Sequence, residues 1–140
     1  MTANSVWSLH PQLAADTVPV GELALARVLL AHDANYPWLI LVPRKPALTE
    51  LIDLDESGQR QLLAEVDAAA RALKRVTQCD KLNIATLGNM VAQLHVHVIA
   101  RRRSDPAWPK PVWGVVPPRG YEPQARAAFI AAIRAELNVA

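Results

Sequence analysis

One stretch of the chain decides its fold, Gln93-Leu94-His95-Val96-His97-Val98-Ile99. Large apolar residues alternate with polar ones over this stretch, which is the pattern of a β-strand with one buried face. We therefore predict a strand from about Val91 to Ala100, with its apolar side chains facing a core. Its opposite face would carry one polar row, Gln93, His95 and His97. Since an imidazole has an unperturbed pKa of about 6.5, this row can transfer protons or attack an electrophile near neutral pH.

The composition predicts one folded, soluble domain over residues 1–140. A chain with 51% hydrophobic and 20% charged residues fits that class, and this length buries roughly two-thirds of the unfolded surface. The formal net charge of +2 is too small to indicate nucleic acid or an acidic membrane as a partner. The single cysteine, Cys79, excludes an intramolecular disulfide and a cysteine metal site, and it favours the reducing cytoplasm. We see neither a signal peptide nor an apolar run approaching the roughly 18–20 residues that span a bilayer.

The residues before the histidine stretch predict two strands and a long helix. Two apolar runs, 25–30 and 38–42, lie in a β-rich region with turn residues between them, so we expect neighbouring antiparallel strands. Pro43 ends the second strand, because proline cannot continue a ladder. A helix follows, capped by Asp53 or Asp55 and running to about Gln78. Its predicted inward stripe is Leu62, Val66, Ala69, Leu73 and Val76, and its predicted solvated positions are Arg60, Glu65, Arg71 and Lys74.

The rest of the chain predicts one more strand, an irregular arm and a final helix. Residues 81–87 form the strand, which ends at the turn Gly88-Asn89. Arg101–Arg103 would alternate across the end of the histidine strand and be solvated. Proline-rich residues 104–123 form the arm, and residues 122–138 form an amphipathic helix. The fold class is α+β, a central antiparallel sheet of about five strands with one long helix and a C-terminal helix.

With the histidine row in place, the chain resembles the histidine triad (HIT) superfamily of nucleotide hydrolases and transferases. That family carries His-φ-His-φ-His-φ-φ, where φ is apolar, and here Gln93 replaces the first histidine. His32-Asp33 ahead of the strand at 38–42 is similar to the family's ribose-binding strand pair. The long helix, strand, glycine turn and histidine strand follow in family order, and Trp108 and Trp113-Gly114 are similar to the tail of some branches. The resemblance covers residues 23–114.

The resemblance implies a HIT-like domain that works through a covalent intermediate. His95 corresponds to the histidine that attacks the α-phosphorus of a nucleotide. The nucleotidyl-histidine that forms is then resolved by water or another acceptor. His97 would contact the phosphate or bridging oxygens, and Gln93 would act as an orienting amide. The implied function is a hydrolase or nucleotidyl transferase, without a cofactor, that cleaves at the α-phosphate of a purine nucleotide conjugate.

Further residues would bind this small-molecule substrate. Asp33 matches the acidic residue that grips the ribose hydroxyls. The turn of Gly88, Asn89 and Met90 lies where the family holds phosphate, and its backbone N–H groups can bind phosphate oxygens. The resemblance also implies a homodimer whose sheets join across the interface. The base would lie between apolar side chains such as Leu25, Val28 or Leu41.

Other interpretations of the same residues stay open. Gln93 cannot titrate and Met90 lacks a hydroxyl, which favours as an alternative a catalytically weak nucleotide-binding or sensing protein that keeps the pocket. A metal-dependent enzyme is a third interpretation, since His95 and His97 also form a ligand pair, although metals take three or four ligands. The two histidines can also be satisfied polar residues on an edge strand. The arm can pack on its own domain or cross to a second subunit.

Overall fold

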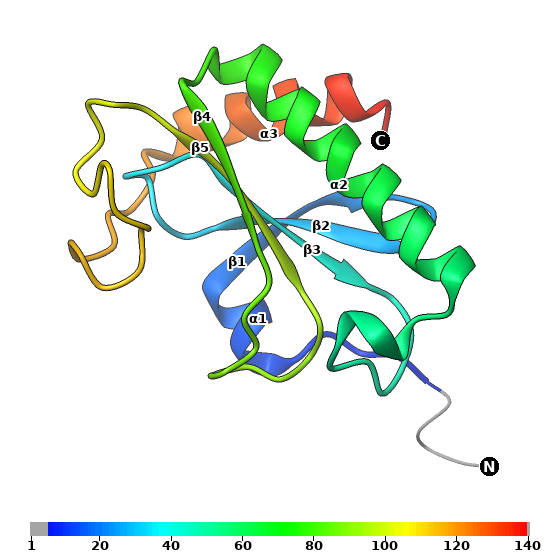
Figure 1. The fold of residues 1–140 in the computed structure, drawn as a ribbon. Coiled ribbons are helices and arrows are strands. Elements are labelled where there is room, and N and C mark those ends of the chain that lie inside the picture. The colour runs from blue at the N-terminus through cyan, green and yellow to red at the C-terminus, as the bar shows by residue number, and fades with distance from the viewer. Residues whose placement is uncertain (1–5, 140) are drawn as a thin grey trace.

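The computed structural model describes residues 6–139 and shows an antiparallel sheet with helices on both faces (Figure 1). Five strands form the sheet in the spatial order β1-β2-β3-β5-β4. This arrangement confirms the α+β fold class, with one long helix and a C-terminal helix. In chain order the elements are α1 (Pro11–Asp16), β1 (Thr17–Glu22), β2 (Ala26–Ala31), β3 (Trp38–Pro43), a 3₁₀ helix (Leu51–Asp53), α2 (Glu56–Thr77), β4 (Lys81–Ala85), β5 (Val96–Arg101) and α3 (Pro123–Leu137).

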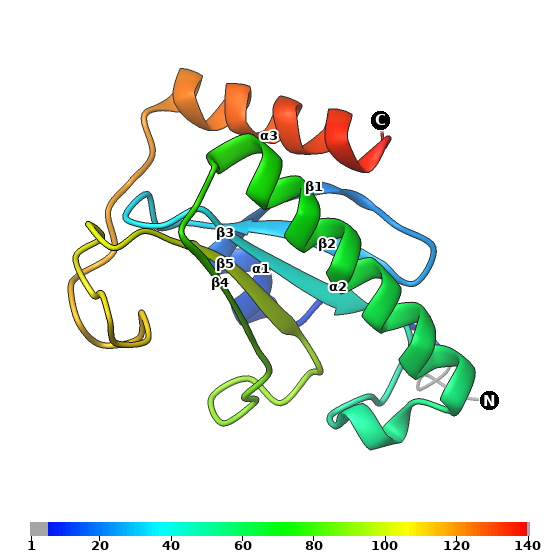
Figure 2. The same cartoon turned by 45° about the horizontal axis from the view of Figure 1, so that its top comes forward.

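The two faces of the sheet have different covers. Helices α2 and α3 pack on one face, and α1 lies against the other (Figures 1 and 2). In β3, Leu39 and Leu41 belong to the core beneath α2, whereas Ile40 belongs to the cluster that includes Leu13 of α1. Ile40 is also the register partner of His97. Because paired residues of antiparallel strands point to the same side, His97 lies on the α1 face.

The sheet confirms one predicted strand pair and corrects one predicted strand boundary. Strands β2 and β3 are antiparallel neighbours, with Val28 opposite Leu41, as the two apolar runs predict. Strand β5 starts at Val96 rather than near residue 91, because its partner β3 ends at Pro43 and the ladder stops at the pair of Leu41 with Val96. Gln93 and His95 therefore lie in the segment that leads into β5 rather than in the strand itself.

Helix α2 follows its predicted pattern except at Val76 and Glu65. Asp55 is the N-cap and accepts a hydrogen bond from the Gly58 N–H at 2.7 Å, and Gln78 ends the helix in the left-handed region. The predicted stripe is buried except for Val76, which is partly buried. Glu65 was predicted to be solvated, and this is wrong because its side chain faces the start of β2 and is 5% exposed. Its oxygens accept 2.8 Å hydrogen bonds from the backbone N–H groups of Leu25 and Ala26.

Replacing Glu65 with glutamine is expected to lower the free energy of unfolding by about 1–3 kcal/mol, because an amide NH₂ would then face a buried backbone donor. Glu56→Gln on the same helix is the matched control, since that carboxylate is 79% exposed in its ion pair with Arg60. It should change stability by less than about 0.5 kcal/mol. Urea titration measures both values. Equal stabilities of the two variants would show that the Glu65 contacts contribute nothing.

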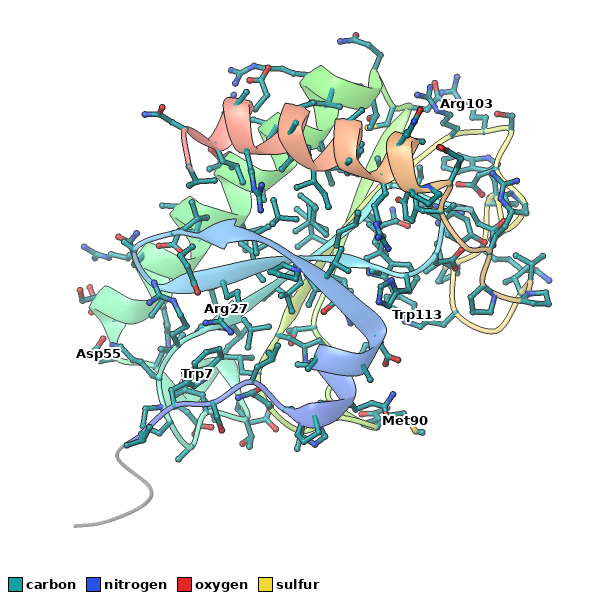
Figure 3. The ribbon with its side chains drawn as sticks, turned by 180° about the vertical axis from the view of Figure 1, so that it is seen from behind. Trp7, Arg27, Asp55, Met90, Arg103 and Trp113 are labelled. Carbon is teal, nitrogen blue, oxygen red and sulfur yellow. The ribbon has the colours of Figure 1, made fainter. Side chains whose placement is uncertain are left out.

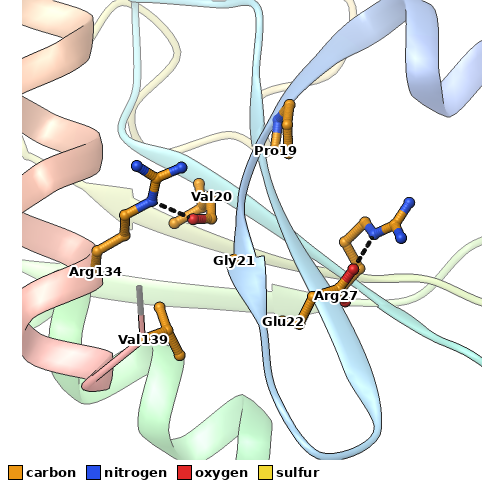
Figure 4. Close-up of a pocket in the computed structure, with 7 residues that line it drawn as sticks. All are labelled: Pro19, Val20, Gly21, Glu22, Arg27, Arg134 and Val139. Carbon is orange, nitrogen blue, oxygen red and sulfur yellow. Dashed lines mark hydrogen bonds and ion pairs between the residues drawn. The ribbon is translucent and has the colours of Figure 1, made fainter.

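Helix α3 packs against strand β1. Its Arg134 Nε donates to the Val20 carbonyl, and Val139 beyond the helix approaches Gly21 so closely that a Cβ on the glycine would lie 2.7 Å from it. A cavity of about 350 Å³ opens beside this contact, next to the Arg27–Glu22 ion pair and on the β1 side of the sheet (Figure 4). The proline-rich segment between β5 and α3 contains turns and bends, as predicted. Within residues 6–139, none of the helices has the length and apolar character needed to cross a membrane.

Candidate active site

His97 lies in β5 among aromatic rings that the sequence did not associate with it. The Trp38 Nε1–H donates to His97 Nδ1 at 3.0 Å. The Trp113 ring meets the His97 ring at 78°, with 5.0 Å between the centroids. Trp113 belongs to the proline-rich arm, which lies at the side of the sheet (Figure 3). Strand β3 and the arm therefore both contribute to the surroundings of this histidine, which is 6% exposed.

The hydrogen bond from Trp38 defines the protonation state of His97. An indole nitrogen can only donate, so His97 Nδ1 is the acceptor and its proton sits on Nε2. Burial, followed by the nearby His95, lowers the pKa of His97 from 6.5 to about 4. His97 is therefore a neutral imidazole at pH 7 and offers a single hydrogen-bond donor, Nε2–H.

His95 has the complementary tautomer. Its Nδ1 lies 2.6 Å from the carbonyl oxygen of Gln93, and a carbonyl can only accept, so Nδ1 carries the proton. In this tautomer Nε2 carries a lone pair, and no hydrogen bond among residues 6–139 engages it. The two imidazoles are close, with centroids 4.9 Å apart and planes at 74°. The site therefore pairs one nucleophilic nitrogen with one donor nitrogen.

Gln93 contributes through its backbone and fastens the N-terminal segment with its side chain. Its Oε1 accepts from the His10 N–H at 2.8 Å, and its Nε2 donates to the Ser8 carbonyl at 2.9 Å. The preceding residue, Trp7, also contacts the sheet, because its ring centroid lies 4.9 Å from the guanidinium carbon of Arg27 in β2 (Figure 3). The sequence offered no signal that residues 8–10 would lie beside the histidine stretch.

Asp33 lies at the end of β2 and is 8% exposed. Its Oδ1 accepts hydrogen bonds from the Asn35 N–H and from the Arg119 N–H, at 3.0 and 3.2 Å. The Asn35 side-chain amide donates to the same oxygen at 2.8 Å and to the Pro117 carbonyl at 2.9 Å. Asp33 thus holds the far end of the arm as well as its own turn, and no described hydrogen bond engages Oδ2.

The other residues predicted to bind substrate lie in two places, an exposed turn and the core beneath α2. Gly88 adopts a left-handed φ of 80°, as the turn requires, while Asn89 is exposed and Met90 is 96% exposed. The suggestion for the base is wrong, because alternation directs its residues into the core beneath α2, away from His97. Those residues are Leu25, Val28 and Leu41. The apolar cluster on the histidine face consists of Leu13, Leu29, Ala31, Ile40 and Val42.

Arg101 was expected to be solvated, and this is also wrong, since it is 1% exposed. Its Nε and one terminal nitrogen donate to the two Asp105 oxygens at 2.7 and 3.0 Å, and its other terminal nitrogen donates to Asn83 Oδ1 at 2.8 Å. The guanidinium carbon lies 5.6 Å from the Trp108 ring centroid. Alternate residues of a strand point to the same face, so Arg101 lies on the same face of β5 as His97. The arm covers this end of that face. The alternation was therefore the signal that could have found it.

No group of three or more His, Cys, Asp or Glu side chains within residues 6–139 is arranged to hold a metal ion. The geometry of the described residues gives the metal-dependent interpretation no support. The site that remains is a pair of complementary imidazoles on one face of a five-stranded antiparallel sheet, with an acidic residue just after β2, which β3 separates from the histidine strand β5.

Comparisons with known proteins identify the family. The HIT domain family model matches residues 12–104. A histidine triad protein from Bradyrhizobium japonicum is 55% identical, with a TM-score of 0.93 over 94% of this chain and 98% of that one. A histidine triad protein from Marinobacter aquaeolei is 43% identical, with a TM-score of 0.92 over 96% of this chain and 98% of that one. A third, from Sinorhizobium meliloti, is 41% identical, with a TM-score of 0.91 over 93% and 96%. No curated protein matches the chain. The chain belongs to the HIT family.

The buried His97 should make folding stability depend on pH. Its pKa is about 4 when folded and 6.5 in the unfolded chain, so the unfolded state binds more protons between these values. The free energy of unfolding is therefore expected to fall as the pH drops from 6.5 to 4, by about 3 kcal/mol. Urea titrations across this range should show that His97→Phe removes this slope, whereas His32→Gln, at an exposed position, keeps it. The same slope in His97→Phe would assign the effect to other groups.

Proposed function

We propose that this HIT protein cleaves nucleotide conjugates at the α-phosphate through a nucleotidyl-histidine intermediate on His95. The observation that carries the proposal is the complementary pair of tautomers, with the two rings 4.9 Å apart. His95 offers a lone pair on Nε2, and His97 offers a proton on Nε2. A phosphoryl group attacked by one ring can therefore be hydrogen-bonded by the other.

The hydrogen bonds of each ring suit its role. The Gln93 carbonyl accepts a hydrogen bond from the Nδ1–H of His95, so it orients the nucleophile and stabilises the positive charge that the ring gains on attack. A neutral His97 donates to a phosphate oxygen as charge shifts onto it, and burial strengthens that hydrogen bond. The nucleotidyl group attached to His95 would then be transferred to water or another acceptor in a second step, which frees the histidine.

The nucleoside would extend from the histidines across β3 and β2. Asp33 lies at the end of β2 and keeps Oδ2 outside the described hydrogen bonds, so one carboxylate oxygen can accept from a ribose hydroxyl. The purine base would lie on the histidine face, beside the partly buried side chains that cover its apolar cluster, such as Trp38 and Val91. Asn89, Met90 and the backbone of Gly88 would lie along the phosphates.

A second candidate function is nucleotide binding or sensing with little turnover. Two observations favour it. The Gln93 side chain is engaged by residues 8–10, where it performs a structural task, and Met90 offers no hydroxyl to a phosphate. Tight binding of a nucleotide without release of any leaving group would support this function over the enzyme.

A panel of adenylyl compounds tests the proposal. It contains an adenylyl phosphoramidate, a diadenosine polyphosphate and an adenylylated amino acid, and the measurement is release of AMP by chromatography. We expect AMP from at least one member, and no AMP when His95 is replaced. Binding of AMP by every preparation, measured by calorimetry, separates a dead enzyme from an unfolded one. Binding without release from any member would transfer the proposal to the sensing function.

We further propose that the protein is a homodimer joined at strand β4. This strand is an edge of the sheet, and an apolar groove of about 290 Å³ lies between it and α2. Ile84 of β4 and Leu63 of α2 line the groove and are 53% and 70% exposed. Exposed apolar patches next to an unpaired strand edge are typical of protein interfaces.

Leu63→Glu is expected to convert the dimer to a monomer, because a carboxylate would be buried in an apolar interface. Light scattering after size-exclusion chromatography measures the mass. Ala127→Glu, an exposed change on α3, should leave the dimer intact. A monomeric wild type, or a dimer that survives Leu63→Glu, would contradict this interface.

A further inference from the structure

We propose that the leaving group departs as a stable anion, such as a phosphate or a carboxylate, because Trp38 prevents His97 from acting as a proton donor to it. The inference rests on the proposed function and names the class of leaving group. Trp38 is thus a positioning residue, since it acts on the reaction through His97.

The contact between Trp38 and His97 disfavours the imidazolium form of His97 near neutral pH. A second proton would have to sit on Nδ1, where it would face the indole N–H at a heavy-atom distance of 3.0 Å. Two donors cannot satisfy one another, and the buried position leaves little water to replace the lost partner. Burial and the neighbouring His95 act in the same direction on the pKa of His97. Neutral His97 can therefore donate a hydrogen bond but has no proton to give away.

The other groups around the two rings do not replace the missing acid. Gln93 has an amide that cannot titrate, and both ends of it are bonded to the backbone of residues 8–10. The Nδ1–H of His95 is engaged in its hydrogen bond to the Gln93 carbonyl. His10, the nearest further imidazole by hydrogen bonding, is exposed, and its Nδ1 accepts from the Gln12 N–H at the start of α1. The row that carries three histidines in the family pattern thus has no group free to protonate a departing base.

The bond changes follow from these protonation states. His95 Nε2 forms a bond to the α-phosphorus with its lone pair, and the bond from phosphorus to the leaving oxygen breaks. The leaving oxygen takes the electron pair, which a phosphate or carboxylate holds without a proton at neutral pH. An amine or an alcohol would have to depart as an amide ion or an alkoxide, both strong bases, unless an acid protonated it. Water then attacks phosphorus, the pair of the P–N bond returns to Nε2, and the proton of the water goes to solvent.

The charge on the intermediate agrees with the same assignment. After attack, His95 carries a proton on Nδ1 and phosphorus on Nε2, so its ring is positively charged. A second cation with a ring centroid 4.9 Å away would oppose that charge. Holding His97 neutral through Trp38 removes the repulsion and leaves the Nε2–H available to the phosphate oxygen.

Two aromatic variants test the role of Trp38. Trp38→Phe keeps a ring but removes the N–H, whereas Trp113→Phe changes the other aromatic neighbour, which has no described hydrogen bond to His97. In ¹⁵N NMR of the wild type, we expect His97 to stay in the Nε2–H tautomer from pH 8 to pH 5. Trp113→Phe should keep that tautomer, and Trp38→Phe should mix the tautomers and raise the pH at which His97 titrates. An unchanged His97 in Trp38→Phe would overturn the role of Trp38.

Matched substrates test the leaving group. Diadenosine triphosphate releases ADP, adenosine 5′-phosphoramidate releases ammonia, and the methyl ester of AMP releases methanol. We expect kcat/KM for the first to exceed the other two by about 10²-fold or more, the usual contribution of a general acid. Trp38→Phe should reduce the preference in kcat/KM for diadenosine triphosphate at pH 5.5, and Trp113→Phe should not.

Equal values of kcat/KM for the three substrates, each abolished by His95→Ala, would overturn the inference while the proposed function stands. No turnover of any of the three, together with none from the wider panel, would overturn both.

Discussion

His95→Ala is expected to lower kcat for nucleotide release by about 10³-fold or more, while the fold and the affinity for nucleotide are kept. The imidazole supplies the only nucleophile in the proposed mechanism, and alanine leaves water to attack the phosphorus directly. His95 is 6% exposed, so its loss also removes some packing, but within residues 6–139 the hydrogen bond of its ring is the local one to Gln93. Circular dichroism and calorimetric binding of AMP check the folded state.

His97→Ala is expected to lower kcat less than His95→Ala does. It removes one hydrogen-bond donor to the phosphoryl group rather than the nucleophile, and loss of such a donor costs about 2.7–4 kcal/mol of barrier, or 10²–10³ in kcat. Release by His95→Ala within a few-fold of the wild-type rate would rule out the covalent mechanism. A larger loss in His97→Ala than in His95→Ala would exchange the roles of the two residues.

Asp105→Ala is expected to destabilise the protein by about 3–5 kcal/mol, because it leaves the Arg101 guanidinium buried without its counter-ion. The carboxylate also accepts hydrogen bonds from the backbone N–H groups of Ala107 and Trp108, at 3.1 and 2.8 Å. Urea titration measures the loss. The matched control is Asp67→Ala, which breaks an ion pair with the same spacing along the chain but with side chains 67% and 57% exposed. It should cost less than about 1 kcal/mol.

A double variant separates the charge from the packing. Arg101→Met combined with Asp105→Ala removes both ions, and it should recover part of the lost stability, since a neutral side chain can be buried where an unpaired cation cannot. If the double variant is no more stable than Asp105→Ala, the unpaired charge is not the cause of the loss. A single variant that is as stable as Asp67→Ala would show that the buried ion pair is dispensable.

The same ion pair has a defined pH dependence. Burial opposes the charge on Asp105, but hydrogen bonds from Arg101 and from the backbone outweigh it and lower the pKa of Asp105 below the ordinary 3.8. A carboxyl group with a lowered folded pKa contributes stability above its unfolded pKa, and this contribution is lost as the pH falls through the folded value. His97 weakens the protein over the higher window between 6.5 and 4, so acid unfolding should begin with His97 and finish with Asp105.

The arm joins this stability network to the active site. Asp105 fixes the start of the arm through Arg101, and Asp33 fixes its far end through the Arg119 N–H at 3.2 Å. Trp113 lies between the two anchors and contacts His97. The two ends of the arm, which carries Trp113, are therefore held by the nearly buried carboxylates of Asp105 and Asp33. Loss of either anchor should change the environment of His97 as well as the stability.

The parts of the fold that depend on local periodicity could be predicted from the sequence. Apolar runs separated by turn residues predicted the pairing of β2 with β3, and spacing by threes and fours predicted the buried stripe of α2. The alternation of residues 93–99 placed His95 and His97 together, and the structure brings their rings to 4.9 Å. Each of these features is decided by residues close to one another in the sequence.

The features that the sequence could not predict depend on contacts between distant segments. Glu65 is buried because two N–H groups at the start of β2 need an acceptor, and nothing in the helix pattern reports that need. Trp38 and Trp113 meet His97 only after β3 pairs with β5 and the arm folds back. The residues suggested for the base were assigned to the wrong face, because the two faces of an apolar strand can be told apart only when its neighbours are known.

The measurement that tests the central proposal most directly is the trapping of the covalent intermediate. Wild-type protein is mixed with diadenosine triphosphate for milliseconds, quenched under alkaline conditions that preserve phosphorus–nitrogen bonds, and examined by intact-protein and peptide mass spectrometry. We expect a mass increase of one adenylyl group, mapped to His95 and absent from His95→Ala. Steady release of AMP with no adduct on His95, or an adduct that persists in His95→Ala, would contradict the proposed mechanism.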